Sequence, residues 1–408
     1  MKSYHEEWEP AYSPQLVIEE ASRCLLCLDA PCSASCPAGT DPAKFIRSIR
    51  FRNFKGAVET IRINNAFGAV CARVCPTEKY CQKGCTRSGI DRPIDIGRIQ
   101  RYATDFEANI KMEVYHKAPA TGKKVAIIGA GPAGLQAAAS LALKGHEVVV
   151  YEEQEKPGGW LRHGIPTYRL PNEIVDTEID RIVRLGVRVI CNTYISEEKL
   201  MQEILPQYDA VLLSSGTPKG RVLDLFKDNP YVETAVDFLA RVKNQEQKES
   251  IKDNVLIVGG GDVAMDAATT LKALGAKNVT VVAREEMDHF PSSQEEYQLA
   301  HEMNVSIIDG YTPENIEGNV VTFKHVQIPG KLTIQADAIL LACGQHSSVE
   351  NWPSFSANRG EFVVENGQLG QSKLFAAGDI VPGDKSVVYA VKTGKIAAQA
   401  IDSYLGGK

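Results

Sequence analysis

The sequence predicts an α/β protein in which an N-terminal α-helical domain precedes two Rossmann-like dinucleotide-binding domains, the second inserted in the first. Three observations predict this fold. Eight of the ten cysteines lie between residues 24 and 85, in a region of helical periodicity. The strand-and-glycine pattern VAIIGAGPAG begins at Val125, and a second pattern, VLIVGGGDVA, begins at Val255.

Composition narrows the class of protein. With 408 residues, the chain is long enough for two or three domains. Its formal net charge of -6 gives no electrostatic reason to expect nucleic acid or an anionic membrane as a partner. We find no signal peptide, and no apolar run reaches the roughly 20 residues that cross a bilayer. We therefore expect a reducing, cytoplasmic location, where clustered cysteines bind metals more often than they form disulfides.

The helical periodicity extends from residue 14 to residue 110 and is broken by Pro, Gly and the cysteine-bearing loops. Residues 118–124 have the polar composition of a linker. The first predicted domain is therefore a small helical one whose core would be partly inorganic.

The clustered cysteines form two runs, C-x2-C-x4-C-x3-C-P and C-x3-C-P-x4-C-x3-C. The runs consist of Cys24, Cys27, Cys32 and Cys36, and of Cys71, Cys75, Cys81 and Cys85. Iron–sulfur clusters require converging thiolates of this kind. Zinc is the main alternative, but only the first two cysteines have the C-x2-C spacing of a zinc knuckle. The sequence favours an N-terminal α-helical iron–sulfur domain.

The first glycine pattern predicts a dinucleotide site. Gly129 permits the tight turn, Gly131 lets the backbone approach a diphosphate, and Gly134 allows close packing of helix on strand. Glu152 ends the next strand, where a carboxylate can accept hydrogen bonds from ribose hydroxyls. The alternative is a glycine-rich turn without a ligand, but strand, glycines, helix, strand and acid occur here in the expected order.

The second pattern places Gly259, Gly261 and Ala264 at the three fingerprint positions. Arg284 stands at the end of the following strand, where an acid usually selects NAD and an arginine often indicates NADP. Two glutamates follow it directly, and each would oppose a 2′-phosphate by about 1–4 kcal/mol. We therefore favour NAD, and Arg284 can alternatively stack on the adenine or pair with its neighbours.

The C-terminal part contains no third glycine pattern, so we expect it to complete the first fold. It contains a strand at 338–344, the sequence AAGD ending in Gly378 and Asp379, and a helix from about Ser386 to Leu405. The positive end of that helix could stabilise a reduced flavin, and Asp379 could bind ribityl hydroxyls. Asp379 could equally be a turn residue.

Seven segments in this order resemble one family: CLLCLDAPCSASCP, CARVCPTEKYCQKGC, IDIGRIQRY, GAGPAGL, PGGWLRHGIPTYRLP, GGGDVAMD and AAGDI. The family includes the small subunit of glutamate synthase and the N-terminal half of dihydropyrimidine dehydrogenase. Over almost its whole length, the chain resembles the flavin and iron–sulfur subunit of bacterial NAD-dependent dihydropyrimidine dehydrogenase.

The resemblance implies two 4Fe-4S clusters, FAD in the first fold and NAD in the second. It implies that one cluster is bound by Cys24, Cys27, Cys32 and Cys85. It implies that the other is bound by Cys36, Cys75, Cys81 and, as an unusual fourth ligand, Gln100. Cys71 would then ligate nothing, whereas counting alone suggests two sites of four thiolates each.

The resemblance also implies the nucleotide contacts. Those to FAD are Gly129, Gly131, Gly134, Glu152, Gly158, Gly159, Leu161, Arg169, Gly378, Asp379 and Val387. Those to NAD are Gly259, Gly260, Gly261, Asp262, Val263 and Arg284. We expect the helical domain with its two clusters over residues 1–118, the FAD-binding domain over 119–224 and 337–408, and the NAD(H)-binding domain over 225–336.

The function implied is that of an oxidoreductase subunit that receives electrons from NADH. Electrons would pass through FAD and the clusters to an FMN-containing partner subunit, which reduces uracil or thymine reversibly to the 5,6-dihydropyrimidine. Hydride transfer needs no acid or base, so we expect no catalytic side chain. One alternative is an NADPH-dependent glutamate synthase small subunit, which supplies electrons to a glutamate-forming large subunit. Another is a non-catalytic NAD-binding module.

Overall fold

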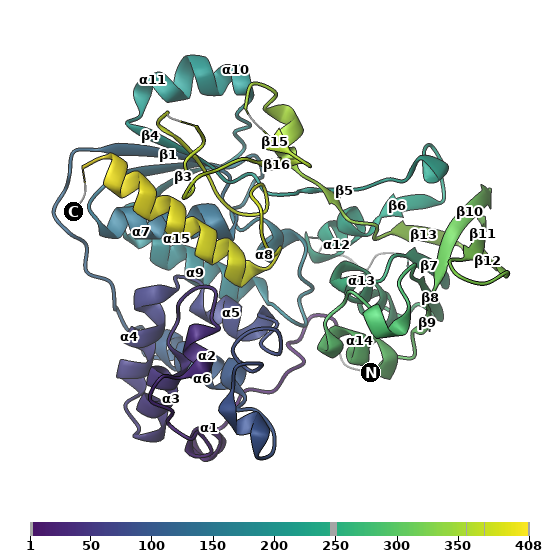
Figure 1. Cartoon of the computed structure of the whole chain (residues 1–408), viewed down its shortest axis with the longest axis horizontal. Coiled ribbons are helices and arrows are strands. Elements are labelled where there is room, and N and C mark those ends of the chain that lie inside the picture. The colour runs from purple at the N-terminus through teal and green to yellow at the C-terminus, as the bar shows by residue number, and fades with distance from the viewer. Residues whose placement is uncertain (1–2, 245–250, 356, 371, 407–408) are drawn as a thin grey trace. The chain divides into compact units, whose positions relative to one another are not determined.

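The computed structural model describes residues 3–244, 251–355, 357–370 and 372–406 (Figure 1). The chain divides into two compact units. The larger one, called the cysteine unit, comprises Glu9–Leu161, Asn172–Thr217 and Ser347–Lys408. The smaller one, called the inserted unit, comprises Met1–Trp8, Arg162–Pro171 and Pro218–His346.

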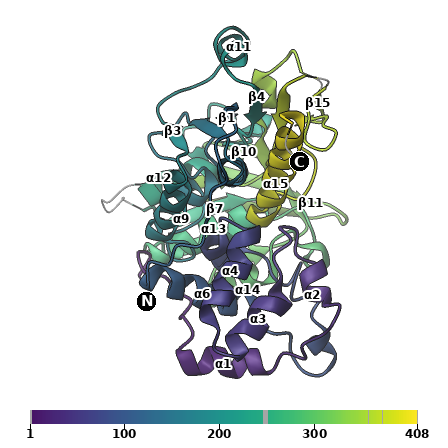
Figure 2. The ribbon, with the colours of Figure 1, turned by 90° about the vertical axis from the view of Figure 1, so that its left-hand side faces the viewer.

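The N-terminal part of the cysteine unit is helical, as predicted. Its helices are α1 (Pro14–Ser22), α2 (Pro31–Ala34), α3 (Pro42–Arg50), α4 (Phe54–Asn64), α5 (Gly68–Val74) and α6 (Ile96–Asn109), with the 3-10 turn η1 (Thr86–Gly89). Four of them begin at a polar residue whose side chain accepts a first-turn N–H: Ser13, Asp41, Asn53 and Asp95. Helices α3, α4 and α6 lie side by side in both views (Figures 1 and 2).

The cysteines belong to the core of these helices. Its buried apolar side chains include Phe45, Ile49, Ile61 and Ile99. Four of the clustered cysteines lie in this core or pack against it: Cys24, Cys32, Cys81 and Cys85. The thiols therefore face surroundings of low polarity.

A parallel sheet of five strands follows in the cysteine unit, in the order β17-β4-β1-β2-β3. The strands are β1 (Lys124–Ile128), β2 (Glu147–Tyr151), β3 (Arg188–Ile190), β4 (Ala210–Leu213) and β17 (Leu374–Ala376). Every residue of β4 and β17 is buried, as expected for a parallel sheet that is covered on both faces.

Helix α15 (Val387–Tyr404) packs along α7 (Pro132–Leu143), as Figure 1 shows. A Cβ atom at Gly394 would stand 2.4 Å from the carbonyl oxygen of Ala133, so the helices approach closely because this residue is glycine. Strand β17 and α15 come after the inserted unit in sequence but belong to the first sheet and its helix layer. The predicted fold class, with one dinucleotide fold inserted in the other, is confirmed.

The cysteine unit is completed by short elements around the first sheet. They are α9 (Asn172–Arg184), α10 (Glu197–Lys199), η2 (Leu200–Ile204), α11 (Leu205–Gln207), η5 (Ser348–Asn351), β15 (Ala357–Asn358) and β16 (Glu361–Phe362). Helix α8 (Trp160–His163) spans the division between the two units.

The inserted unit contains a second parallel sheet, ordered β6-β13-β7-β8-β9, and an antiparallel sheet, ordered β10-β11-β12. Its strands are β5 (Lys219–Gly220), β6 (Val232–Thr234), β7 (Asn254–Val258), β8 (Asn278–Val282), β9 (Ser306–Ile308), β10 (Tyr311–Glu317), β11 (Val320–His325), β12 (Lys331–Gln335), β13 (Ala338–Leu341) and β14 (Gln345–His346). Its helical elements are η3 (Asp224–Phe226), α12 (Ala235–Asn244), α13 (Asp262–Ala273), η4 (Met287–His289) and α14 (Gln294–Glu302).

The prediction that the strand at 338–344 returns to the first fold was wrong. Strand β13 pairs with β6 and β7 in the second sheet, and the return to the first sheet occurs only at β17. An apolar run shows that a strand is buried but does not show which of two parallel sheets it joins. The boundaries expected for the three domains stay a prediction, and β13 lies on the other side of the expected limit at residue 337.

Candidate functional site

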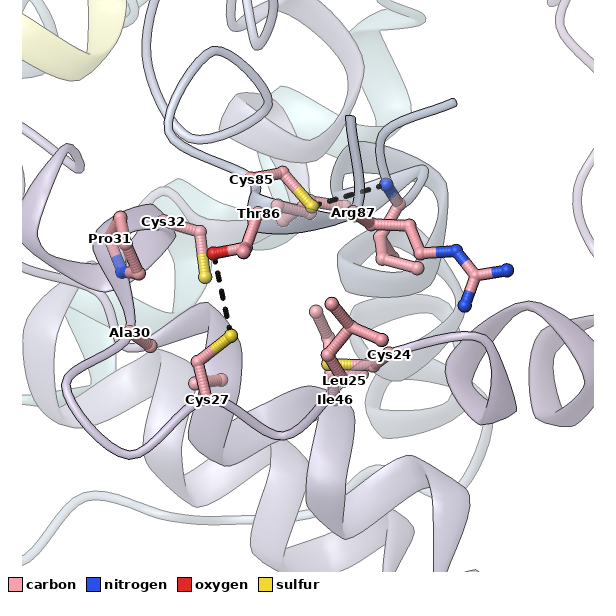
Figure 3. A pocket seen from close by; sticks show the side chains of 13 residues that line it. Cys24, Leu25, Cys27, Ala30, Pro31, Cys32, Ile46, Cys85, Thr86 and Arg87 are labelled. Atoms are coloured by element: carbon pink, nitrogen blue, oxygen red, sulfur yellow. Dashed lines mark hydrogen bonds between the residues drawn. The ribbon is translucent and has the colours of Figure 1, made fainter. Parts of the chain in front are cut away.

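Four cysteines surround one cavity of the helical region (Figure 3). Cys24 and Cys27 follow α1, Cys32 lies in α2, and Cys85 immediately precedes η1. Figure 3 shows their side chains around a common space, with the Cys27 sulfur 3.5 Å from the Thr86 hydroxyl. We call this space the first thiol cavity.

Four more cysteines line a second cavity, called the second thiol cavity, together with a glutamine: Cys36, Cys71, Cys75, Cys81 and Gln100. Cys71 lies in α5, Cys75 ends that helix, and Gln100 lies in α6. Thus the first cysteine run contributes Cys36 to the second cavity, and the second run contributes Cys85 to the first cavity. The grouping is the one that the resemblance implied, although the ligand assignment stays a prediction.

The orientation of the Gln100 amide leaves its oxygen for another partner. The Nε2 atom donates to the carbonyl of Gly68 over 2.7 Å. No described residue donates a hydrogen bond to Oε1, although the side chain is 9 % exposed and lines the cavity. An amide oxygen in this position can bind a metal.

Burial makes the free thiolates unfavourable in both cavities. It raises the pKa of Cys32 to about 11, and those of Cys71 and Cys81 to about 12. It also raises the pKa of Cys24 and, strongly, that of Cys75. A bound metal supplies the positive charge that deprotonates such thiols, so the cavities fit metal binding better than free cysteine chemistry.

Each cavity is lined by four thiols, and a 4Fe-4S cluster binds four protein ligands. The residues present therefore fit 4Fe-4S clusters.

The first dinucleotide turn has the geometry expected from its glycines. Gly129 has a φ of +103°, which lies in the region that favours glycine. A Cβ atom at Gly134 would stand 2.2 Å from the Gly129 carbonyl oxygen, whereas one at Gly131 would meet nothing within 4 Å. Gly134 therefore serves packing, and Gly131 leaves open space at the start of α7 where a diphosphate can approach the helix N-terminus.

Glu152 lies at the end of β2 and is tied to this turn. Its Oε2 accepts from the backbone N–H of Ala130 over 2.7 Å, and its Oε1 accepts from that of Gln154 over 2.9 Å. Burial raises the pKa of Glu152, and these hydrogen bonds oppose the effect. The carboxylate is thus held beside the glycine turn.

Other predicted FAD contacts lie in the same unit. Gly159 has a φ of +53°, and a Cβ atom there would stand 3.0 Å from the Cα of Gly131. Leu161 is fully buried. Burial raises the pKa of Asp379, and a hydrogen bond with Thr217 opposes this rise. The structure thus brings the first glycine turn and the 158–161 segment together.

Two further predicted FAD contacts, Gly378 and Val387, lie close to α7 or at the start of α15. Gly378 has a φ of +82°, its N–H donates to the hydroxyl of Thr393, and a Cβ atom there would stand 3.0 Å from the Cβ of Ala133 in α7. Val387 is the first residue of α15. The AAGD turn is therefore fastened both to α7 and to α15.

Arg169 is placed differently from the other predicted FAD contacts. It belongs to the inserted unit, where its guanidinium is paired with Asp266 and Glu296, at 2.8 Å each. Its role toward FAD stays a prediction, and in the described structure its partners are the acidic side chains of Asp266 and Glu296.

The second glycine turn precedes α13 in the inserted unit. Gly259 has a φ of +127°, and a Cβ atom there would stand 2.3 Å from the Ala342 carbonyl oxygen. A Cβ atom at Gly260 would press on Phe290, whereas one at Gly261, the N-cap of α13, would meet nothing. Gly261 therefore leaves the helix N-terminus open to a diphosphate, as in the first fold.

The other NAD candidates flank this turn. Asp262 accepts from the N–H of Ser293 over 2.7 Å, and Val263 packs against the core of the unit. Arg284 is 72 % exposed and pairs with Glu285 at 3.1 Å. The pairing with its neighbour is one of the two alternatives that the sequence left open for Arg284.

Sequence reasoning missed two residues that connect the sites. Ile96, the first residue of α6, lines both thiol cavities, and Val388 in α15 lines the second one. Val388 directly follows a predicted FAD contact, but an apolar residue early in a helix carries no signal of such a role. The hydroxyl of Tyr80, next to Cys81, donates to Asp384 and lies 3.2 Å from the Ser386 hydroxyl at the N-cap of α15.

Comparison with known proteins places the chain in a family. Residues 1–112 match the family described as dihydropyrimidine dehydrogenase domain II, 4Fe-4S cluster, and residues 123–394 match the pyridine nucleotide-disulphide oxidoreductases. No helix in the described part of the chain is long and apolar enough to cross a membrane.

The chain is 56 % identical over 406 residues to the NAD-dependent dihydropyrimidine dehydrogenase subunit PreT of Escherichia coli K12, covering 100 % of this chain and 98 % of that protein. It is 30 % identical over 443 residues to the small chain of NADPH glutamate synthase of the same organism, covering 98 % and 93 %. Thioredoxin reductase of Lactococcus lactis shares the fold, with a TM-score of 0.57 and 19 % identity over 70 % of this chain and 99 % of that one. The chain therefore belongs to the PreT family of NAD-dependent dihydropyrimidine dehydrogenase subunits, which are oxidoreductases with a 4Fe-4S domain and a pyridine nucleotide domain.

Proposed function

We propose that the chain is the NADH-oxidising, electron-input subunit of a dihydropyrimidine dehydrogenase. It passes electrons from NADH by way of FAD and 4Fe-4S clusters to an FMN-containing partner subunit, which reduces uracil or thymine to the 5,6-dihydropyrimidine. Full-length similarity to relatives named as subunits of that enzyme supports the proposal. When bound, FAD converts the two-electron donor nicotinamide into a source of single electrons, which clusters accept.

One observation supports the proposal: the helix that begins at the predicted flavin site lines the second thiol cavity, and Ile96 lines both cavities. Val387 is a predicted FAD contact, and its neighbour Val388 lines the second thiol cavity. Ile96 then lines both cavities. All three residues belong to the cysteine unit, so the predicted flavin end of α15 and both thiol cavities lie in one compact unit.

The loop of the second cysteine run is fastened to the same end of α15. Tyr80 contacts Asp384 and Ser386, and Lys79 pairs with Asp384 at 2.5 Å. Lys395, also in α15, donates to the carbonyl of Ala38, two residues after Cys36, over 2.6 Å. These contacts hold the second thiol cavity against the helix that begins at the predicted flavin site.

The chain's own residues have binding roles rather than acid–base roles. We propose that Cys24, Cys27, Cys32 and Cys85 hold one cluster, and that Cys36, Cys75, Cys81 and Gln100 hold the other. The two glycine turns and Glu152 hold the dinucleotides. We assign no catalytic proton donor, because hydride transfer between nicotinamide and flavin requires none.

We propose NADH as the donor, because Arg284 is already paired with Glu285 and a second glutamate follows. Each carboxylate opposes a 2′-phosphate. The relative at 30 % identity is named as an NADPH enzyme, so the alternative is a glutamate synthase small subunit that uses NADPH. A clear preference for NADPH in cofactor oxidation would favour this alternative.

The decisive experiment is to assay pyrimidine reduction by the purified chain with and without its partner. We expect NADH to bleach the flavin of the isolated chain while uracil remains unchanged, and uracil to be consumed once the partner is added. Uracil reduction by the isolated chain would contradict the division of the enzyme into two subunits. A colourless chain purified without oxygen, lacking flavin and iron, would instead indicate a non-catalytic NAD-binding module.

A further inference from the structure

The second thiol cavity offers more ligands than one cluster can use. Four thiols and the Gln100 amide line it, whereas a 4Fe-4S cube has four iron corners and binds one protein ligand at each iron. The proposed assignment uses three cysteines and Gln100. Cys71 is therefore the one thiol of the eight that has no assigned partner, although it lines the same cavity as the others.

Cys71 is placed like a ligand. It lies one helical turn before Cys75, whose N–H donates to the Cys71 carbonyl over 3.1 Å. Residues four apart in a helix project to the same side, and both side chains line the second cavity. The Cys71 side chain is also buried, with 4 % exposed, so little space is available to it outside the cavity.

Gln100 is attached to the helix that carries Cys71. Its Nε2 donates to the carbonyl of Gly68, the first residue of α5, over 2.7 Å. Helices α5 and α6 pack on each other, so the amide and the Cys71 thiol approach the cavity from adjoining positions. The two groups are therefore candidates for the same corner of the cluster.

Asn65 holds the Cys71 side chain in place at the cavity. Its Oδ1 accepts from the N–H of Phe67 over 2.8 Å, which directs the amide nitrogen away from that backbone. The Asn65 side chain lies against Cys71 and also lines the cavity. The Gln100 oxygen, which has no hydrogen-bond donor among the described residues, would be free to bind the cluster.

We propose that Cys71 is a reserve ligand of the second cluster, which takes the iron of the fourth corner when Gln100 does not. In this exchange the bond from iron to Oε1 would break and a bond from iron to the Cys71 sulfur would form. The thiol proton leaves to solvent, and no electron is transferred. The inference rests on the proposed cluster ligands and adds a residue that they do not use.

The test compares the anaerobically prepared chain with Cys71→Ala, Gln100→Ala and the double variant. Iron content, the electron paramagnetic resonance (EPR) spectrum of the reduced protein and the midpoint potential are measured. We expect about eight irons per chain in the wild type and in each single variant, as two clusters require, and about four in the double variant. In Gln100→Ala, the EPR signal of the second cluster should change and its potential should fall, because a thiolate adds negative charge.

A control variant, Thr104→Ala, removes a buried side chain of α6 that lines neither cavity and should keep about eight irons. The FAD content reports whether each variant is folded. About four irons in Gln100→Ala would show that Cys71 cannot replace the amide, and about four in Cys71→Ala would show that it already ligates. About eight in the double variant would require another ligand. Each of these results overturns the reserve role, whereas a wild type without 4Fe-4S clusters contradicts the proposed function itself.

Discussion

The substitution Glu178→Gln tests the buried ion pairs that join the helical region to the first dinucleotide fold. Arg62 in α4 donates to Glu107 in α6, with the closest contact at 2.6 Å, and to Glu178 in α9, also at 2.6 Å. All three side chains are 1 % exposed. Glu178 also accepts a hydrogen bond from the N–H of Ala69 in α5, over 3.0 Å. The preceding residue, Gly68, accepts the hydrogen bond from Gln100.

The expected loss follows from these contacts. Glu178 accepts two charge-assisted hydrogen bonds from Arg62, at 2.6 and 3.0 Å, and each contributes about 1.5–3 kcal/mol. Arg62 and Arg181 share the carboxylates of Glu107 and Glu178, so without Glu178 one positive charge of this group is left unbalanced. Removing one partner of a buried ion pair costs about 3–5 kcal/mol. We expect Glu178→Gln to lower the free energy of unfolding by that amount.

The assay is urea unfolding of the anaerobic protein, followed by circular dichroism and by cluster absorption. The matched control is Glu147→Gln, because Glu147 pairs with Lys124 at 3.7 Å and both side chains are about half exposed. That variant should lose about 0–1 kcal/mol. If Glu178→Gln loses no more than the control, the buried pairs contribute no net stability and the reasoning is refuted.

Three further predictions concern the nucleotide folds. Gly134→Ala should lose about 1–3 kcal/mol of stability through overpacking. Gly131→Ala should keep its stability and lose only FAD, because its Cβ meets no protein atom. Equal shifts of the unfolding temperature in the two variants would contradict this. Glu285→Gln should raise the ratio of kcat/KM for NADPH to kcat/KM for NADH by up to about 10-fold, since it frees Arg284 and removes a repulsive charge. An unchanged ratio would refute this prediction. Burial raises the pKa of Glu296 to about 8, so the proton that it retains in the folded state stabilises the fold at low pH, and this stability is lost as the pH rises through about 8. Glu296→Gln should therefore flatten the pH profile of the free energy of unfolding. A profile parallel to that of the wild type would contradict the raised pKa of Glu296.

The local features of the fold could be predicted from the sequence because they depend on neighbouring residues. The two glycine turns follow from strand, glycine spacing and helix, and Gly129 and Gly259 indeed have positive φ values. The helical character of residues 14–110 follows from apolar periodicity and polar caps such as Ser13.

Features that depend on long-range pairing were harder to predict. Strand β13 was expected in the first sheet and lies in the second. The apolar sequence of a strand does not show which strands it pairs with. Each thiol cavity takes cysteines from both runs, because Cys36 lines the second cavity and Cys85 lines the first. This grouping depends on how the helices between the runs pack. Family resemblance implied this grouping, whereas counting thiols along the chain suggested two self-contained sites.

The connecting residues were invisible in the sequence for a different reason. Ile96 and Val388 are ordinary apolar residues at helix starts, and their significance lies only in lining the thiol cavities. Arg169 stays a predicted flavin contact, and the structure adds that its guanidinium pairs with Asp266 and Glu296.

Anaerobic titration of the isolated chain with NADH, followed by flavin absorption and by EPR at low temperature, tests the central claim most directly. We predict that NADH bleaches the flavin, that addition of the partner subunit and uracil restores its colour, and that uracil alone does not. Restoration by uracil in the absence of a partner, or a flavin that responds to NADPH but not to NADH, would contradict the assignment of the chain as the NADH-oxidising electron-input subunit.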